Sequence, residues 1–317
     1  MGRMRSGVGG VVAAMLVLTL LGGSQLVAQL VVHPGAASAA SVTPFRGLGT
    51  WVDAYDYAAA YQPYGAPAPV TPASVDDMAR LGVRTVYFQA AKADNRSPGP
   101  LVDDRLAGEF LVRAHRNGIR VVAWYLPLLS DVDADLAHVR AMHDFQSDGQ
   151  RFDGIALDVE WTQGVPDTSQ RNSRLVTFTK RARKLVGSET PLGAIVYPAV
   201  QLELINPSLW PNFPYRKLAP SVDVWMPMAY WTFRTADYRD AFHYTDDSVQ
   251  RLRARLHDSH AVVHAIGGIA DGTSAFDYER FLQAVATDKA IGWSVYDYNT
   301  TASSAWPRLR TGPPAGT

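Results

Sequence analysis

Two acidic residues, Asp158 and Glu160, stand at the end of an apolar segment that covers residues 153–161. Side chains alternate across a β-strand, so Ala156, Asp158 and Glu160 share one face. The two acids then lie roughly 6 to 7 Å apart along the backbone, from a rise of about 3.3 Å per residue. A close carboxylate pair has its pKa values pushed apart, which supplies one proton donor and one proton acceptor near neutral pH. We therefore expect acid–base chemistry here. The alternative is a structural pair held by backbone N–H groups or arginines.

The elements that must position this pair repeat along the chain. Apolar runs alternate with helical segments at a spacing of roughly 30 to 40 residues, which is the size of a βα unit. Eight runs are predicted as strands: 46–53, 83–90, 120–126, 152–161, 192–198, 222–231, 261–269 and 291–299. Helical patterns cover 103–117, 132–145, 171–186, 246–257 and 278–288. This order predicts an α/β protein with a closed (β/α)8 TIM barrel in one domain. A doubly wound sheet is the alternative, but no glycine-rich phosphate turn follows the first run.

Barrel enzymes place their sites at the carboxyl ends of the strands, so the last residues of each run matter most. Flat aromatic surfaces suit the C–H faces of sugar rings, and Tyr and Trp add hydrogen bonds. By alternation, Trp293 should share a face with Asp297, and Tyr296 should take the opposite face. We predict that the strand ends bind substrate through Trp51, Asp53, Gln89, Tyr125, Trp161, Tyr197, Met228, Trp231, Trp293 and Asp297, with Tyr230 beside the acid pair.

Composition excludes several classes of function. The 317 residues include 30 basic and 30 acidic side chains, so the formal net charge is zero and offers no field for nucleic acid. Cysteine is absent, which rules out thiol catalysis, disulfides and thiolate metal sites. The histidine pairs His138 with His143 and His260 with His264 lack a third ligand in the sequence. We therefore predict no metal and no cofactor.

The amino-terminal segment has the pattern of an export signal. Arg3 and Arg5 precede an apolar run over residues 8–32, and small residues occupy 36–40. We predict that residues 1–40 are a signal peptide or, alternatively, a membrane anchor. Residues 41–310 should form the barrel and residues 311–317 a flexible tail. Either form of the segment places a monomeric barrel outside the cytoplasm, in contact with a membrane only if the segment is not removed.

The segment 153–160 resembles the strand-four signature of glycoside hydrolase family 18, the chitinase-like barrels. In that family the last Glu is the proton donor, and the Asp two residues earlier orients the acetamido group of the substrate. The resemblance implies these roles for Glu160 and Asp158. Residues 228–230 are similar to the strand-six motif of the family, and Trp293 fits its sugar-floor tryptophan. The resemblance implies a TIM barrel that acts on an amino sugar polysaccharide.

Two positions depart from this family pattern. Ala156 stands where the family has another inward-facing Asp, and Trp231 stands where Asp or Asn follows the Tyr. Loss of the inner Asp removes the partner toward which the central carboxylate swings. The acid pair, together with Asp53 and Asp297, also resembles the lysozyme-like barrels of glycoside hydrolase family 25, which cleave peptidoglycan.

These observations predict a secreted glycoside hydrolase whose partner is a polysaccharide or a peptidoglycan-type glycan. Glu160 would protonate the glycosidic oxygen, Asp158 would stabilise charge at the sugar, and Tyr230 would position an acetamido group or a water. The alternative is a carbohydrate-binding barrel that has lost catalysis, which the residues Ala156 and Trp231 favour. An unused buried acid pair costs stability, so the enzyme is the preferred hypothesis.

Overall fold

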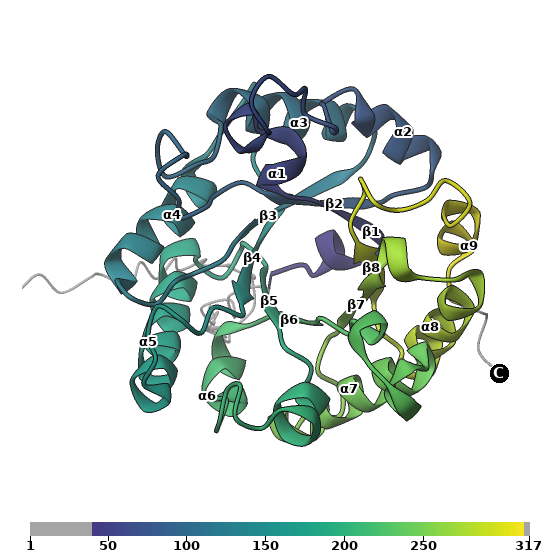
Figure 1. The fold of residues 1–317 in the computed structure, drawn as a ribbon. Coiled ribbons are helices and arrows are strands. Elements are labelled where there is room, and N and C mark those ends of the chain that lie inside the picture. The colour runs from purple at the N-terminus through teal and green to yellow at the C-terminus, as the bar shows by residue number, and fades with distance from the viewer. Residues whose placement is uncertain (1–39, 314–317) are drawn as a thin grey trace, which may run out of the picture. The chain divides into compact units, whose positions relative to one another are not determined.

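Eight parallel strands form the centre of the protein in a computed structural model, which describes residues 40–313 (Figure 1). The strands are β1 (Gly47–Val52), β2 (Thr85–Gln89), β3 (Arg120–Tyr125), β4 (Gly154–Val159), β5 (Leu192–Val196), β6 (Val224–Pro227), β7 (His264–Ile269) and β8 (Gly292–Tyr296). Their order in the sheet is β6-β5-β4-β3-β2-β1-β8-β7. Parallel bridges from Trp225 to Val263 and from Met228 to Ile266 join β6 to β7 and nearly close the ring.

Helices follow the strands and cover the outside of the ring (Figure 1). They are α1 (Ala54–Tyr57), α2 (Ser74–Arg80), α3 (Asp104–Arg116), α4 (Val132–Asp144), α5 (Thr168–Val186), α6 (Tyr215–Leu218), α7 (Ala241–Leu256), α8 (Ala275–Thr287) and α9 (Trp306–Thr311). The longer helices α3, α4, α5, α7 and α8 each start after a side chain that accepts a hydrogen bond from a first-turn N–H group. These caps are Asp103, Asp131, Asp167, Asp240 and Ser274. A cap of this kind typically contributes about 1 kcal/mol, because it satisfies a donor that the helix end leaves free.

Alternating side chains on the strands build two apolar layers. Outward-facing residues such as Leu157 and Val159 pack under the helices, whereas inward-facing residues such as Ile195 fill the ring. Phe45, just before β1, closes the amino-terminal end of the ring. A Cβ atom at Gly193 would lie 2.8 Å from the Phe45 ring, so a larger residue at position 193 would force that ring to move.

A polar network crosses the interior of the ring. His264 is fully buried, its Nε2 atom lies 2.9 Å from the Ser294 hydroxyl, and its Nδ1 atom lies 2.9 Å from the carbonyl oxygen of Phe45. The indole N–H of Trp51 donates to the same Ser294 oxygen at 2.9 Å. Because the carbonyl oxygen of Phe45 can only accept, the proton of the neutral imidazole lies on Nδ1, and Nε2 accepts the proton of the Ser294 hydroxyl. Burial lowers the pKa of His264 to about 4, so the ring is neutral at physiological pH.

The (β/α)8 barrel predicted from the sequence is confirmed. The largest difference in bounds is at the sixth strand, which ends at Pro227 because the chain then turns into the short helix η5 (Trp231–Phe233). Within residues 40–313, none of the helices is both long enough and apolar enough to cross a membrane. Residues 1–39 of the predicted export segment and residues 314–317 of the predicted tail lie outside the described residues.

Candidate active site at the carboxyl end of the barrel

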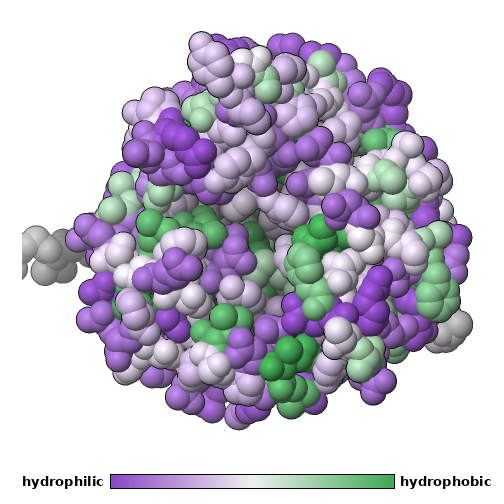
Figure 2. All heavy atoms as spheres, in the orientation of Figure 1, coloured by the Kyte–Doolittle hydropathy of each residue, from purple (hydrophilic) through white to green (hydrophobic). Residues whose placement is uncertain are grey.

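Asp158 and Glu160, hereafter the β4 pair, lie where β4 reaches the mouth of the barrel, at which Figure 2 shows a central recess. Asp158 is 7% exposed, and its Oδ1 atom has no hydrogen-bond partner among the described residues. Burial raises the pKa of both carboxyls, and the charge of Glu160 raises that of Asp158 further. Burial and the like charge of a neighbour both favour the protonated form of a carboxyl, so each member of the pair binds a proton more tightly than a free carboxyl does.

Burial is the main cause of the raised pKa of Glu160, whereas at Asp158 the charge of Glu160 adds to burial. Asp158 is the deeper of the two carboxyls, since Glu160 is only partly buried. The upward shift in pKa is accordingly the more pronounced at Asp158.

Lys92 is a cation at this mouth that the sequence analysis missed. It follows the end of β2 by three residues, and its charge lowers the pKa of both carboxyls of the β4 pair against the effect of burial. Its Nζ atom lies 5.2 Å from the centre of the Tyr55 ring, which is within the range of a cation–π interaction. A single lysine in a loop has no periodicity to mark it, and its position just beyond a strand end was the one available signal.

Tyr197, which follows β5, and Tyr230, which follows β6, lie beside the β4 pair. The Tyr197 hydroxyl donates a 3.2 Å hydrogen bond to the carbonyl oxygen of Glu160, and burial with the nearby carboxylates raises its pKa to about 12. Burial, together with the charges of the β4 pair, raises the pKa of Tyr230 well above its usual value. Both phenols therefore stay protonated; Tyr230 can donate to a ligand, whereas the Tyr197 proton is already donated to the Glu160 carbonyl. Met228 packs with Tyr230 in the inner apolar layer.

Asp53, Asp56 and Asp297, hereafter the β1–β8 cluster, form a second acidic group at the ends of β1 and β8. One oxygen from each lies within 4.8 Å of the others, a spacing that could hold a metal ion. Burial raises the pKa of Asp56 to about 7, with a further contribution from the charges of Asp53 and Asp297. Burial also raises the pKa of Asp297. This cluster therefore carries fewer charges at neutral pH than its three carboxyls suggest.

The protein itself uses the oxygens of the β1–β8 cluster. Asp53 Oδ1 accepts the N–H groups of Tyr55 at 2.7 Å and Asp56 at 3.2 Å, and its Oδ2 accepts the hydroxyl of Tyr296. Asp56 returns a bond to the N–H of Asp53 at 3.0 Å, which completes a capping box at the start of α1. Asp297 accepts the N–H of Thr300 at 2.8 Å. Asp56 was missed from the sequence, although two acids at this spacing are a known sign of a capping box.

The floor of the recess is aromatic. Trp51 stacks on Tyr87 with ring centres 4.5 Å apart and meets the edge of Trp124 at 6.0 Å. Ala156 lies opposite Trp124 in the β3–β4 register and belongs to the same inner apolar layer. The rings thus occupy the interior beside position 156, which offers Asp158 no carboxylate partner. Trp51 was predicted to contact sugar, but it is almost fully buried and forms part of this floor.

Tyr125 and Trp293 face away from the recess, which corrects their predicted roles. The Tyr125 hydroxyl donates a 2.6 Å hydrogen bond to Asp135 in the outer layer, under α4. The Trp293 indole donates to the Leu309 carbonyl at 3.0 Å, under α9. On β8 it is Tyr296 that packs against the inner layer. The prediction extended the alternation past Tyr296, where the strand has already ended.

Trp231 also lies outside the recess, contrary to its predicted role in substrate binding. Its side chain is fully buried, and its ring centre lies 5.2 Å from that of Phe281. A Cβ atom at Gly267 or Gly268 would lie 2.9 Å from the Trp231 ring, so these two glycines make the space that it fills. Trp231 therefore anchors the β6–α7 loop to the barrel.

Gln89 and Trp161 have contrasting positions at the mouth. The Gln89 side-chain oxygen accepts the N–H of Ala54 at 2.9 Å, and its backbone carbonyl accepts the Tyr57 hydroxyl at 2.8 Å. Gln89 thus holds α1 in place and is itself buried. Trp161 directly follows Glu160 and is 37% exposed, so its ring remains open to a ligand.

The fold of this chain is similar to that of several solved glycoside hydrolases. No protein-family model matches the chain, and no curated protein matches it. The family 18 chitinase of Cycas revoluta, solved with allosamidin, is 13% identical with a TM-score of 0.58, over 83% of this chain and 98% of that chain. A class V chitinase from Pseudomonas fluorescens Pf-5 is 12% identical with a TM-score of 0.60, over 84% and 99%. The spore cortex-lytic enzyme SleL of Bacillus megaterium is 7% identical with a TM-score of 0.60, over 92% and 78%.

These identities carry the fold but no activity. They do match the resemblance that the β4 segment indicated, because two of the three structures are described as chitinases. The chain therefore has a TIM barrel like that of the family 18 glycoside hydrolases.

Proposed function

We propose that this protein is an exported glycoside hydrolase that cleaves an amino sugar polysaccharide, with Glu160 as the acid. The observation that carries this proposal is the β4 pair: a buried and a partly buried carboxyl at the mouth of the barrel, both with a raised pKa and one of them with an unused oxygen. A barrel that needed these acids only for structure would pair them with donors, because an unpaired buried polar group costs stability.

In the proposed reaction, Glu160 donates its proton to the glycosidic oxygen as the bond to the anomeric carbon breaks. A proton held by the β4 pair is placed on Glu160 for this step, and Asp158 as a carboxylate stabilises the positive charge of the sugar. In one route, an acetamido oxygen of the substrate, oriented by Tyr230, attacks the anomeric carbon, and a water then displaces it, giving its hydroxyl to the sugar and its proton back to Glu160. In the other route, a single water attacks the anomeric carbon directly and gives its proton to a carboxylate of the pair. The carboxyls and the substrate suffice for this sequence, so the proposal needs no cofactor.

Position 156 favours one other function, a sugar-binding barrel without turnover. The proposed chemistry has no deeper carboxylate for Asp158 to turn toward, because Ala156 lies beside Trp124 instead. If catalysis requires Asp158 to turn from an inner carboxylate toward Glu160, this chain cannot do so, because Ala156 replaces that inner carboxylate. The binding function would keep the exposed ring of Trp161 and the donor Tyr230.

The test is release of reducing ends by the protein from residue 41 onward. The substrates are chitin oligomers, peptidoglycan and a set of plain glucans. The Glu160→Gln variant should lose turnover by about 100-fold or more, since general acid catalysis contributes about that much. Glu109→Gln is the matched control, because Glu109 lies on the outside of α3 in an exposed ion pair with Arg105.

Each outcome decides between the two functions. Turnover that is lost in Glu160→Gln and kept in Glu109→Gln supports the enzyme, and the preferred polymer distinguishes chitinase-like from lysozyme-like specificity. Binding of a glycan by both variants with no turnover by the wild-type protein would instead establish the sugar-binding barrel. A separate experiment tests export. The full chain is produced in a bacterial host, and the medium outside the cells is examined for the protein.

A further inference from the structure

Phe233 is an exposed aromatic side chain at the mouth that no role so far explains. It is 63% exposed and ends the short helix η5, which follows β6 and Tyr230 directly. A ring held this far into water gains little from burial. Scattered exposed apolar residues are ordinary, so exposure alone assigns nothing to Phe233. Its contacts are more informative.

Phe233 is the outermost member of a row of rings that leads into the recess. Its ring centre lies 6.4 Å from that of Tyr230, and Tyr230 lies 6.5 Å from Tyr296. Tyr296 lies 6.2 Å from Trp51 on the floor. These four rings form a nearly continuous wall from solvent to floor, and Tyr230 within it borders the β4 pair. A sugar chain that placed one unit at the acids would therefore run out along this wall.

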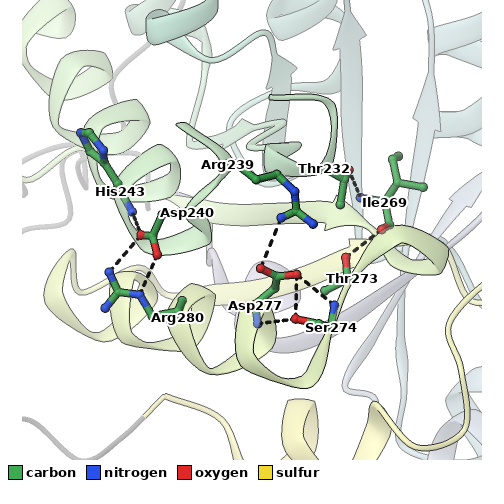
Figure 3. Close-up of polar contacts among 9 residues, drawn as sticks. All are labelled: Thr232, Arg239, Asp240, His243, Ile269, Thr273, Ser274, Asp277 and Arg280. Atoms are coloured by element: carbon green, nitrogen blue, oxygen red, sulfur yellow. Dashed lines mark hydrogen bonds and ion pairs between the residues drawn. The ribbon is translucent and has the colours of Figure 1, made fainter. Parts of the chain in front are cut away.

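The turn that carries Phe233 is fixed by contacts of the residues on either side of it. Trp231 is fully buried against Phe281. The N–H of Ile269 donates to the Thr232 hydroxyl at 3.2 Å, and these two residues are shown in Figure 3. On the other side, the Arg234 guanidinium donates to the Gln201 side-chain oxygen at 2.5 Å. The three residues around Phe233 thus each have a partner on another part of the barrel.

The rest of the β6–α7 loop is fixed to α8 by charge. Arg239 donates to Asp277 at 3.3 Å, and Asp240 accepts two bonds from Arg280 at 2.9 Å (Figure 3). Asp277 also accepts the Ser274 hydroxyl and N–H, so the start of α8 belongs to the same set of bonds. A ring held on a rigid loop can bind a ligand without first losing much conformational freedom.

We propose that Phe233 forms an outer subsite that stacks on the apolar face of a pyranose ring of the glycan, one or more units away from the bond at Glu160. This inference rests on the proposed function and adds to it the means of holding a polymer. Phenylalanine has no donor or acceptor, so the subsite would recognise the C–H face of a sugar and tolerate varied substituents.

The exposed ring of Tyr55 differs and does not suit the same task. Its neighbours are Lys92, 5.2 Å from the ring centre, and Arg96, 5.5 Å from it. Cations therefore occupy space beside the Tyr55 ring that a sugar would need. Phe276, at the start of α8, is 65% exposed, nearly the same as Phe233. Within residues 40–313, Phe276 has no aromatic partner in the wall, which makes it a matched control.

The experiment compares Phe233→Ala with Phe276→Ala in the barrel protein from residue 41 onward. Binding of the hexasaccharide and the disaccharide of N-acetylglucosamine is measured by calorimetry, in the Glu160→Gln background so that no cleavage occurs. We expect Phe233→Ala to weaken hexasaccharide binding by about fivefold to tenfold, as loss of one stacked ring predicts. Disaccharide binding should change less than about twofold, because two sugar units at the acids do not reach the subsite. Phe276→Ala should leave both unchanged.

Two further variants separate stacking from loop integrity. Phe233→Trp should restore hexasaccharide binding, whereas Phe233→Leu, which keeps an apolar side chain without a flat face, should not. Equal hexasaccharide affinity for Phe233→Ala and Phe276→Ala would overturn the subsite while leaving the proposed function intact. Equal loss for hexasaccharide and disaccharide would also overturn it, because that pattern reports a disturbed loop. If the Phe233-intact protein bound neither saccharide, the proposed function would fail together with the subsite.

Discussion

The β4 pair and the β1–β8 cluster are both groups of buried carboxyls at one mouth, yet the protein treats them differently. In the β1–β8 cluster, Asp53 receives two backbone N–H groups and a phenol, and Asp297 receives the bonds of Thr300. In the β4 pair, Asp158 is as buried as Asp297, and its Oδ1 atom has no partner among the described residues. The nearest compensation for its charge comes from Lys92, by Coulomb attraction.

This difference separates a structural role from a chemical one. Hydrogen bonds from backbone N–H groups stabilise the ionised carboxylate and hold a helix start, so the oxygens of Asp53 are already used. The unpaired oxygen of Asp158 costs stability, and burial raises its pKa well above the ordinary value. Burial alone does not mark a functional acid. The contrast with the equally buried Asp297 shows that the supply of donors is the better guide.

The largest expected effect comes from Asp158→Asn. The amide keeps the size of the side chain but removes the ionisable group, so we expect hydrolysis to fall by about 100-fold or more. The midpoint of thermal unfolding should stay the same or rise, because the variant no longer has a buried carboxyl to ionise. Turnover of the preferred glycan and calorimetric unfolding measure the two quantities. A variant that lost stability and kept its turnover would reverse the assignment of roles.

A buried carboxyl outside both groups sharpens the comparison. Asp288 ends α8, accepts a 2.6 Å bond from Gln250, and has its pKa raised to about 7 by burial and then by the charge of Asp246. Folding thus favours the protonated form. The contribution of Asp288 to the free energy of unfolding is fully present below the ordinary pKa near 3.8 and is lost as pH rises through about 7.

We expect Asp288→Asn to remove this loss of stability. Its gain in the free energy of unfolding over the wild-type protein should be larger at pH 8 than at pH 4, by on the order of 2 kcal/mol. Urea unfolding at the two pH values measures it. Turnover should not change, since Asp288 lies on the outer helices. A loss of turnover comparable to that of Asp158→Asn would show that raised pKa, and not position at the mouth, governs activity.

A smaller effect is expected within the β1–β8 cluster. Asp53→Ala removes the cap of α1 and should lower the free energy of unfolding by about 1 to 2 kcal/mol, whereas Asp53→Asn keeps an acceptor and should cost much less. Urea unfolding compares the two. Because Asp53 also receives the Tyr296 hydroxyl, we expect turnover to fall less than tenfold in either variant. Equal stability of the two variants would mean that the capping bonds contribute little.

The fold could be predicted because its signal is local and repeated. Each strand is an apolar run and each long helix has one apolar face, so the order of elements follows from periodicity alone. The β4 pair was found for the same reason, since both acids lie within one strand pattern. The bounds at the sixth strand were less accurate, because nothing in residues 222–231 marks Pro227 as the end.

The remaining site depends on contacts between distant segments. Whether Trp231 faces sugar or core is decided by the absence of side chains at Gly267 and Gly268, which belong to another strand. Tyr125 is the last residue of β3, but alternation along the strand turns its side chain to the outer layer, so a position at the strand end does not by itself predict contact with the recess. Lys92 and Phe233 lie in loops with no period, so only the folded structure brings them to the acids.

The smallest effect, and the most specific test of the β4 pair, concerns Lys92. Its charge lowers the pKa of both carboxyls, so Lys92→Met should raise both values and move the pH profile of kcat/KM to higher pH on its acidic and basic limbs together. Lys180→Met, on the exposed side of α5, removes the same charge from the surface and should leave the profile in place. Asp53 provides the internal comparison, because its carboxylate is held by hydrogen bonds that Lys92 does not supply. Because both pKa values of the folded protein rise, the stability of Lys92→Met should also fall relative to the wild-type protein as pH rises through them. An unchanged profile would mean that Lys92 does not set the ionisation of the pair in the free enzyme.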